Sequence, residues 1–254
     1  MIAPRPSPPT PDAVSVLRAS RLLAALPDEL LTQLQHYGEV RSYNAGEVSH
    51  LGWGANAAVF FVLRGAFRVS RMTVNGRFVS MRAARVGDHF GEIEVFSRGP
   101  LALNTIHCDQ SGACYVLPGP RFCAMLAGSP SLAEEVVHAI SAEANRRAER
   151  IYEFVTLDVR SRLLAELCRL AEAGRIDGVG ARIEPAPTHD MLATQVGSSR
   201  EGVTRHLKDF ARRGLLKVPR RGVIDIIDRA ALRAALAKES GECGPEPMAA
   251  GANW

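Results

Sequence analysis

Residues 196–214 read VGSSREGVTRHLKDFARRG. The segment predicts a helix from Arg200 to about Arg212, because Ser199 has the side-chain oxygen of a good N-cap and Gly214 ends the run. At 100° per residue, the side chains of this helix separate into a polar arc and an apolar arc. The apolar arc holds Val203, Leu207 and Phe210. One face of the helix is therefore expected to pack on a core, and the other is free to bind.

The polar arc has the residue types that read the major groove of DNA. Arginine can bind guanine O6 and N7 with two hydrogen bonds, and glutamate can accept from cytosine N4. The alternative is an ordinary i,i+4 ion pair between Glu201 and Arg205 on an exposed helix, worth only ~0.2–0.5 kcal/mol. The candidates for base contacts are Arg200, Glu201, Thr204 and Arg205.

Further elements are expected on both sides of this helix. An amphipathic helix is predicted over residues 159–173, ending at Gly174, and a shorter one over residues 188–195. Two short strands, 215–218 and 222–227, then form a hairpin. The order is helix, turn, helix and wing.

Positive charge is concentrated in the same part of the chain. The 254 residues have a formal net charge of +4, whereas residues 200–221 hold eight basic and two acidic residues. Such clustering is typical of nucleic-acid binding, although a solvated charged face is the alternative when charge stands alone. Phosphate contacts give affinity without sequence information. The residues expected to make them are Thr188, Ser198, Ser199, Lys208, Arg212, Arg213, Lys217, Arg220 and Arg221.

The composition excludes several classes of protein. A hydrophobic fraction of 46% and a charged fraction of 23% are those of a folded chain, not of a disordered one. The apolar runs fall well short of the ~20 residues of a membrane span, and the proline-rich start lacks the apolar core of a signal peptide. We therefore expect a cytoplasmic protein without a membrane partner. The five cysteines have no CxxC spacing, which argues against a disulfide framework or a zinc knuckle.

Between residues 21 and 126 the chain predicts a short helix after Pro27 and then many short strands. A tight hairpin is predicted at Arg64-Gly65, and a second at Asn75-Gly76, because Asn-Gly tolerates the positive φ angles of a type I′ turn. Short strands at this spacing are typical of a β-sandwich or a small barrel.

A long helix is predicted over residues 131–155, with one narrow apolar stripe. Such a stripe suits packing against a second copy of the chain, and packing against its own barrel is the alternative. The stripe consists of Leu132, Val136, Ile140, Ala144, Ala148, Ile151 and Val155. The chain thus divides into a disordered tail (1–16), a β-rich domain (17–130), the long helix (131–155), a helix-turn-helix domain (156–238) and a second disordered tail (239–254).

These motifs resemble the CRP/FNR family of bacterial transcription regulators, over about residues 21 to 237. One departure is Gly202, which stands where Thr or Ala is usual. The motifs that carry the resemblance are 86–93 (VGDHFGEI), 156–163 (TLDVRSRL), 197–207 (GSSREGVTRHL), 213–216 (RGLL) and 221–224 (RGVI).

The resemblance implies an α+β fold with an N-terminal double-stranded β-helix (jelly-roll), a long dimerisation helix and a C-terminal winged helix-turn-helix. It implies a homodimer that binds double-stranded DNA palindromes with half-sites close to TGTGA or TTGAT and acts on RNA polymerase. By analogy, Arg200, Glu201 and Arg205 read the central TGA, and Thr204 stands where FNR-type members often carry Ser. The sequence contains no catalytic grouping, so an enzyme is not expected.

The resemblance places an effector pocket in the β-rich domain. In the family's cyclic-nucleotide binders, a Gly-Glu pair opens a short helix, and an arginine about ten residues later pairs with the phosphate. Here that arginine is replaced by Leu101, so cyclic nucleotide is not expected as an effector, and neither a cofactor nor a metal is assigned. Arg98 could substitute only if its loop were rearranged. The expected pocket residues are Gly91, Glu92, Ile93, Arg98, Leu101, Ala102 and Arg147.

Two alternatives stay open at this point. One is an effector-free or thiol-controlled regulator that uses Cys108, Cys114, Cys123 or Cys168. The other is a small-molecule-binding module whose basic helix docks an acidic protein. In the leading hypothesis, a signal shifts a hinge near residues 156–158 and reorients two recognition helices.

Overall fold

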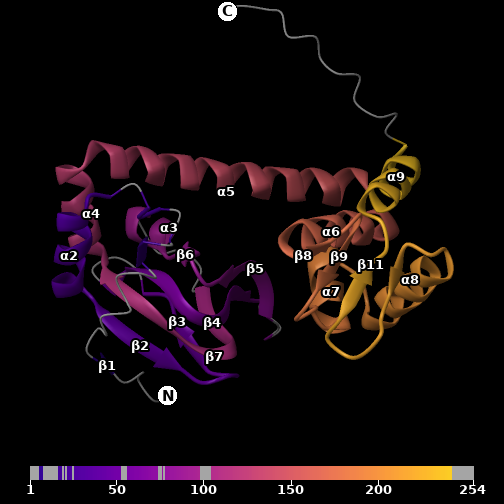
Figure 1. The fold of residues 1–254 in the computed structure, drawn as a ribbon, viewed down its shortest axis with the longest axis horizontal. Helices are drawn as coiled ribbons and strands as arrows, with labels where there is room; N and C mark the ends of the chain where they lie inside the picture. Colours follow the sequence, from indigo (N-terminus) through magenta and orange to yellow (C-terminus); the bar gives the residue numbers. More distant parts are fainter. Residues whose placement is uncertain are drawn as a thin grey trace, which may run out of the picture. The chain divides into compact units, whose positions relative to one another are not determined.

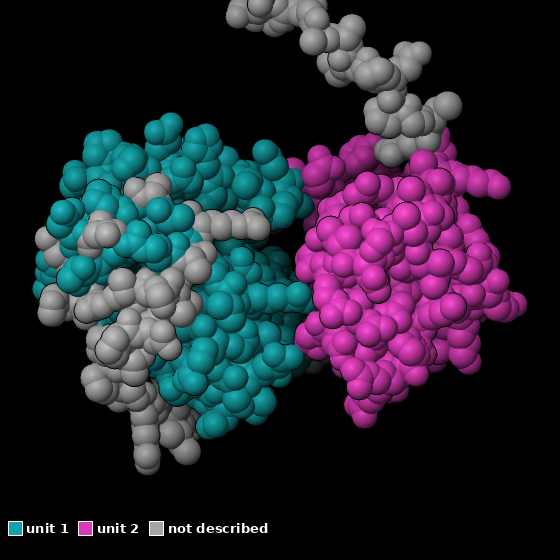
Figure 2. Space-filling model, in the orientation of Figure 1, with its two compact units in different colours: residues 1–146 teal, residues 147–254 magenta. Residues whose placement is uncertain are grey.

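The computed structural model describes residues 6–7, 17–18, 20, 22–24, 26–52, 56–73, 76, 78–97 and 104–241. The chain forms two compact units, residues 1–146 and 147–254, which Figure 2 shows in different colours. The predicted α+β class is confirmed, because the first unit is rich in strands and the second contains a helix-turn-helix with a small sheet (Figure 1). The long helix α5 (Pro130–Thr156) runs through the boundary.

An antiparallel sheet forms the body of the first unit. Among the described residues its strands follow the path β1-β2-β7-β4-β5, with β3 paired to β7 and β6 paired to β4. The strands are β1 (Pro6–Ser7), β2 (Glu39–Tyr43), β3 (Val48–His50), β4 (Ala58–Met72), β5 (Phe78–Arg85), β6 (His89–Phe90) and β7 (Asn104–Pro118). The helices are α2 (Asp28–Tyr37), α3 (Glu92–Phe96) and α4 (Gly119–Gly128), besides the first part of α5.

The predicted hairpin at Arg64-Gly65 is wrong, because β4 continues through these residues. Gly65 has φ +82° and lies at a shift in the register between β4 and β7. A Cβ added to Gly65 would lie 2.8 Å from the Cα of Gly112 on β7, so the two glycines allow the strands to bend past each other. The other predicted hairpin is confirmed: Met72 of β4 pairs with Phe78 of β5 around Gly76, although other residues of that turn lie outside the described ones.

Two hydrophobic cores flank β4. Val59 and Phe61 belong to one, while Phe60 and Val62 belong to the other, as the two-residue period of a strand requires. The first core also contains residues of α2, α4 and α5. Pro6–Ser7 pair with β2 inside the segment expected to be a loose tail, and the rest of residues 1–16 lies outside the described ones.

The apolar stripe of α5 is divided by the fold. Leu132 and Val136 are 1% and 4% exposed and lie in the core of the first unit, so they are not available to a second copy. Ile140 packs partly against the same core. Further along, Ile151 and Val155 are 66% and 80% exposed. The first turns of α5 therefore pack on the chain's own β-rich unit, which was the alternative to packing on a second copy.

The second unit has the predicted order of helices and strands, with two additions. Its elements are α6 (Val159–Ala173), β8 (Arg175–Asp177), β9 (Gly180–Ile183), α7 (His189–Val196), α8 (Arg200–Arg212), β10 (Leu216–Lys217), β11 (Ile224–Ile226) and α9 (Arg229–Ser240). The predicted bounds of α6 and α8 are confirmed, and Val203, Leu207 and Phe210 of α8 lie in the core. The hairpin β8–β9 and the helix α9 are not predicted from the sequence.

Helix α9 begins inside the predicted helix-turn-helix domain, in a segment with no predicted element of its own. The Asp228 side chain accepts hydrogen bonds from the backbone N–H groups of Ala230 and Ala231, which is the geometry of an N-cap. The helix continues to Ser240, two residues into the segment predicted as disordered, and Gly241 follows with φ +70°. Residues 242–254 lie outside the described ones.

Candidate nucleic-acid interface

The turn before α8 is fixed by glycine and serine. Gly197 has φ +62°, and an added Cβ would lie 2.8 Å from Cε1 of Phe154, so glycine is required on two grounds. The Ser199 hydroxyl accepts a hydrogen bond from Gly202 N at 3.0 Å, as expected of an N-cap. A Cβ at Gly202 would lie 2.7 Å from Ser198 Oγ, so a larger residue there would require the Ser198 hydroxyl to turn away.

A shallow, open hollow runs along the polar face of α8. The four candidates for base contacts line it together, and Lys208 lies beside them, as does Arg212. Within the described part of the chain, Glu201 and Arg205 make no ion pair with each other, so the ordinary ion-pair interpretation does not account for their spacing. Arg200 comes within 3.8 Å of Asp190, and both side chains are well exposed. The arrangement leaves side chains of both charge signs free to bind a groove.

One polar contact of this face was not anticipated from the sequence. His189, the first residue of α7, places its Nδ1 atom 2.8 Å from Oγ1 of Thr204. The contact joins residues fifteen apart on two helices, so no local sequence signal could have identified it.

The residues expected to meet phosphates have different surroundings. Lys217 and Arg221 are exposed on the wing, and Arg220 binds Glu184 in an exposed ion pair at 2.6 Å. The Thr188 hydroxyl accepts from Met191 N at 3.2 Å and caps α7, which begins one residue later than predicted. Ser198 is half-buried beside Gly202.

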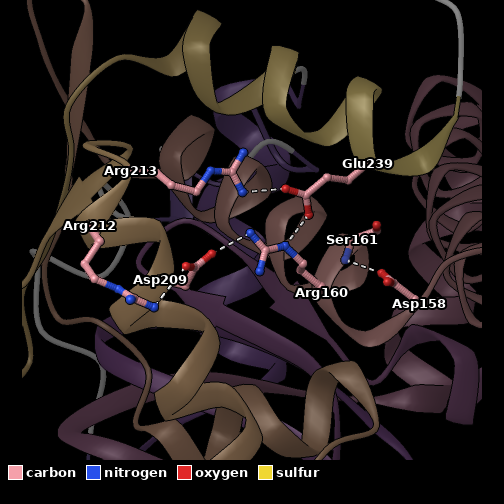
Figure 3. A network of polar contacts seen from close by, with 7 residues as sticks. All are labelled: Asp158, Arg160, Ser161, Asp209, Arg212, Arg213 and Glu239. Atoms are coloured by element: carbon pink, nitrogen blue, oxygen red, sulfur yellow. Dashed lines mark hydrogen bonds and ion pairs between the residues drawn. The ribbon is translucent and has the colours of Figure 1, made fainter.

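A network of charged side chains ties the end of α8 to α6 and α9 (Figure 3). Arg160 of α6 donates from Nε to Glu239 of α9 at 2.6 Å, and it also donates to Asp209 of α8. Arg213 donates to Glu239, so it is held by α9 and not free near a phosphate as expected. Arg212 donates to Asp209 at 3.1 Å. Helix α8 is thereby attached to α6 and α9 near its C-terminal end.

The charges of this network shift the acidity of its carboxylates. The hydrogen bond from Arg160 lowers the pKa of Asp209. Burial by itself raises the pKa of Glu239, but the hydrogen bonds from Arg160 and Arg213 lower it overall. Both carboxylates are therefore held in the ionised form that the arginines require.

The last turns of α5 are bound to the same body as the helix-turn-helix. Glu153 accepts hydrogen bonds from Arg169, and Arg150 forms an ion pair with the buried Glu166 at 2.9 Å. The Arg162 guanidinium lies 4.8 Å from the centre of the Phe154 ring. The residues just before the expected hinge at 156–158 are thus attached to α6, which argues against a hinge at that point.

The start of α3 carries the residues expected in an effector pocket. Gly91 has φ +102°, and an added Cβ would lie 2.2 Å from the carbonyl oxygen of Ala58. Glu92 is 1% exposed, and its Oε1 accepts from Arg82 of β5 at 2.9 Å. Sequence reasoning missed this arginine. Ile93 is half-buried in α3, Arg147 belongs to the second unit, and Arg98, Leu101 and Ala102 lie outside the described residues.

His89 lies beside this pair and is 7% exposed. Burial, with a further contribution from the Arg82 charge, lowers the pKa of His89 to about 4. The imidazole is therefore neutral near pH 7, and its 4.0 Å approach to Glu92 is not an ion pair there. Within the described residues, His89 Nε2 and Glu92 Oε2 are buried without a hydrogen-bond partner.

The pKa values of the cysteine thiols bear on the alternative that the protein is a thiol-controlled regulator. Burial raises the pKa of Cys108 and of Cys114, and it raises the pKa of Cys168 to about 11. Thiols of this kind are poor nucleophiles near neutral pH. Cys123 is exposed on α4.

The described residues offer neither a metal site nor a membrane span. They contain no cluster of three or more His, Cys, Asp or Glu side chains that could hold a metal ion. None of their helices is long and apolar enough to cross a membrane.

Two family models match the chain, one in each unit. A cyclic nucleotide-binding domain matches residues 40–129, and a Crp-like helix-turn-helix domain matches residues 161–235. Together the two matches take in more than half of the chain.

Similar proteins include two curated relatives and one solved structure. A CRP-like cAMP-activated global transcriptional regulator from Mycobacterium tuberculosis is 25% identical over 65% of this chain and 74% of its own length. The transcriptional regulator SdrP from Thermus thermophilus is 28% identical over 70% of this chain and 85% of its own. The crystal structure of a CRP/FNR family transcriptional regulator, also from Thermus thermophilus, has a TM-score of 0.63 and 26% identity, covering 80% of this chain and all of that one.

Proposed function

Because the chain belongs to the CRP/FNR family of DNA-binding transcription regulators, we propose that it works as a homodimer on a palindromic site and that its first unit controls this binding. The observation that carries the proposal is the polar face of α8. Arg200, Glu201, Thr204 and Arg205 share one open hollow, which the basic residues Lys208 and Arg212 also line. Family members are regulators and not enzymes.

The proposed site has half-sites of the TTGA or TGTGA type. Arg200 and Arg205 supply the guanidinium groups for guanine, and Glu201 supplies an acceptor for cytosine N4. Lys208, Lys217 and Arg221 are exposed and can reach phosphates. Thr204 stands where FNR-type members often carry Ser, which favours a TTGA-like half-site.

The second copy is proposed to pack along the exposed part of α5. Ala144, Ala148, Ile151 and Val155 are exposed and recur at spacings of four, three and four, which is the spacing of a coiled-coil seam. Val137 is 62% exposed and lies seven residues before Ala144, so it extends the same seam. Two copies joined in this way present two recognition helices to a palindrome.

The first unit is proposed to respond to something other than cyclic AMP bound in the family's usual way. The Glu92 carboxylate already accepts a hydrogen bond from Arg82, and Leu101 stands at the position of the phosphate-pairing arginine. These surroundings of Glu92 are compatible with an unidentified effector and also with a regulator that needs no effector. Bound at a promoter, the protein would recruit or obstruct RNA polymerase.

Fluorescence anisotropy tests the proposal. A labelled TTGA-N6-TCAA duplex is titrated with the full chain at fixed salt, against scrambled competitor, with and without cyclic AMP. Preference for the palindrome that ignores the nucleotide supports the proposal. A preference that appears only with cyclic AMP overturns the proposal that the first unit responds to something else. No preference under either condition overturns the proposed half-site.

A further inference from the structure

The side chain of Thr204 makes two hydrogen bonds within the protein. Its Oγ1 lies 2.8 Å from the carbonyl oxygen of Arg200, one turn earlier in α8. The same atom lies 2.8 Å from Nδ1 of His189 on α7. Thr204 also lines the hollow on the polar face of α8, so these bonds decide which of its atoms can meet DNA.

The directions of both bonds follow from the groups involved. A carbonyl oxygen can only accept, so the single hydroxyl hydrogen of Thr204 is directed to Arg200 O. With the hydrogen placed there, the hydroxyl oxygen accepts from His189, which assigns to that imidazole the tautomer with its proton on Nδ1. The hydroxyl of Thr204 therefore has no hydrogen left to donate to a base.

What remains for recognition is the methyl group. A threonine methyl can contact the C5 methyl of thymine, which projects into the major groove. We propose that Thr204 reads a thymine through this methyl–methyl contact, and that His189 is a positioning residue that fixes the Thr204 side chain for it. This inference rests on the proposed role of α8 as the DNA-reading helix.

The experiment removes one methyl at a time from the DNA. A duplex is first selected from a randomised pool by the wild-type protein. Each thymine of the selected half-site is then replaced by deoxyuridine, which lacks only the C5 methyl, and affinity is measured by anisotropy at fixed salt. We expect one position in each half-site to weaken binding about fourfold, which corresponds to ~0.8 kcal/mol for one buried methyl group.

Two variants at Thr204 separate its methyl from its hydroxyl. Thr204→Ser keeps the hydroxyl and loses the methyl, so thymine and uracil duplexes should bind it equally. Thr204→Val has a methyl on both branches of its Cβ, so a methyl can meet the base without the bond to His189. It should keep a preference for thymine even if its overall affinity falls. Lys208→Ala, on the same face, serves as the control and should weaken both duplexes by the same factor.

Variants of His189 test the positioning role. His189→Ala removes the donor to Thr204, and the thymine-to-uracil affinity ratio should fall towards one. His189→Gln supplies an amide donor and should restore the ratio. A residue with only a structural role would change stability or affinity for both duplexes together and leave the ratio unchanged, which would overturn its assignment. Circular dichroism melting of each variant monitors the fold.

The outcomes distinguish this inference from the function on which it rests. If no sequence is enriched from the pool, the DNA-reading function is overturned, and the inference with it. If a sequence is enriched but every thymine tolerates uracil, only the inference is overturned. It is also overturned if Thr204→Ser keeps the full preference for thymine.

Discussion

The carboxylate of Glu239, at the end of α9, accepts a hydrogen bond from Nε of Arg160, near the start of α6, at 2.6 Å (Figure 3). Arg160 in turn binds Asp209 near the end of α8, and its guanidinium lies 5.1 Å from the centre of the Phe210 ring. One arginine therefore joins α9 to the helix that is proposed to read DNA. The fixed position of α8 depends on a segment that follows the wing.

Glu239→Gln should therefore destabilise the second unit. The substitution keeps the shape of the side chain but removes the charge that two arginines share, and both are partly buried there. We expect a loss of about 1.5–3 kcal/mol in the free energy of unfolding, the range for hydrogen bonds to charged groups. Urea denaturation followed by circular dichroism measures it.

Glu172→Gln is the matched control. Glu172 accepts from Arg233 at 2.8 Å, but both side chains are more than half exposed. An exposed pair of this kind contributes ~0–1 kcal/mol. Equal losses for the two variants would show that the Glu239 network has no special role.

A second prediction concerns the stability of the first unit in mild acid. The folded pKa of His89, about 4, lies below the ordinary value of ~6.5, so folding favours the neutral imidazole. The stabilisation is complete above pH ~6.5 and is lost as the pH falls towards the folded pKa, by on the order of 3 kcal/mol. Unfolding measured at several pH values between 7 and 4 should show the loss.

His89→Gln should flatten this dependence, because glutamine has no proton to take up. His138 is exposed on α5, and His138→Gln is the control, which should leave the slope of the wild-type protein in place. The same slope in wild type and His89→Gln would assign the acid sensitivity to other groups.

The helix-turn-helix could be predicted closely from the sequence because its signals are local. Ser199 and Gly197 define the ends of the turn, and Val203, Leu207 and Phe210 define the buried face of α8. Each of these residues acts within one turn or one helix. The bounds of α8 therefore followed from the residues themselves.

The errors arose where distant parts of the chain decide the structure. A glycine such as Gly65 suits a hairpin turn or a bulge equally. It is a bulge here because the register of β4 against β7 shifts at this residue, where the backbone passes close to Gly112. The stripe on α5 does not show whether Leu132 meets a partner or its own barrel. The contacts of Arg82 with Glu92 and of His189 with Thr204 depend on elements that meet only in the folded chain.

A third prediction tests the proposed contact between two copies. Ile151 is 66% exposed on the seam of α5, and Ile151→Glu would place a charge in the centre of that contact. We expect the dimer to dissociate into monomers by analytical ultracentrifugation at concentrations where the wild type stays dimeric. Tyr152 is 56% exposed but lies to one side of the seam, so Tyr152→Glu should leave the dimer in place. A wild-type monomer would contradict the proposal directly.

The last prediction separates base reading from phosphate binding. Arg205 lines the hollow on α8, and its planar guanidinium can form two hydrogen bonds with guanine. Arg205→Ala should lower the preference for the palindrome over scrambled DNA by ~1–3 kcal/mol, roughly 5- to 150-fold.

Lys217 is exposed on the wing, where a phosphate contact carries no sequence information. Lys217→Ala should weaken palindrome and scrambled duplexes by the same factor and reduce the salt dependence of binding by about one counterion. When affinity is measured over a series of salt concentrations, Arg205→Ala should therefore change the preference for the palindrome, whereas Lys217→Ala should change the salt dependence. If Arg205→Ala keeps the wild-type preference, α8 is not the helix that reads the bases, because a guanidinium on its polar face would then contribute nothing to the choice of sequence.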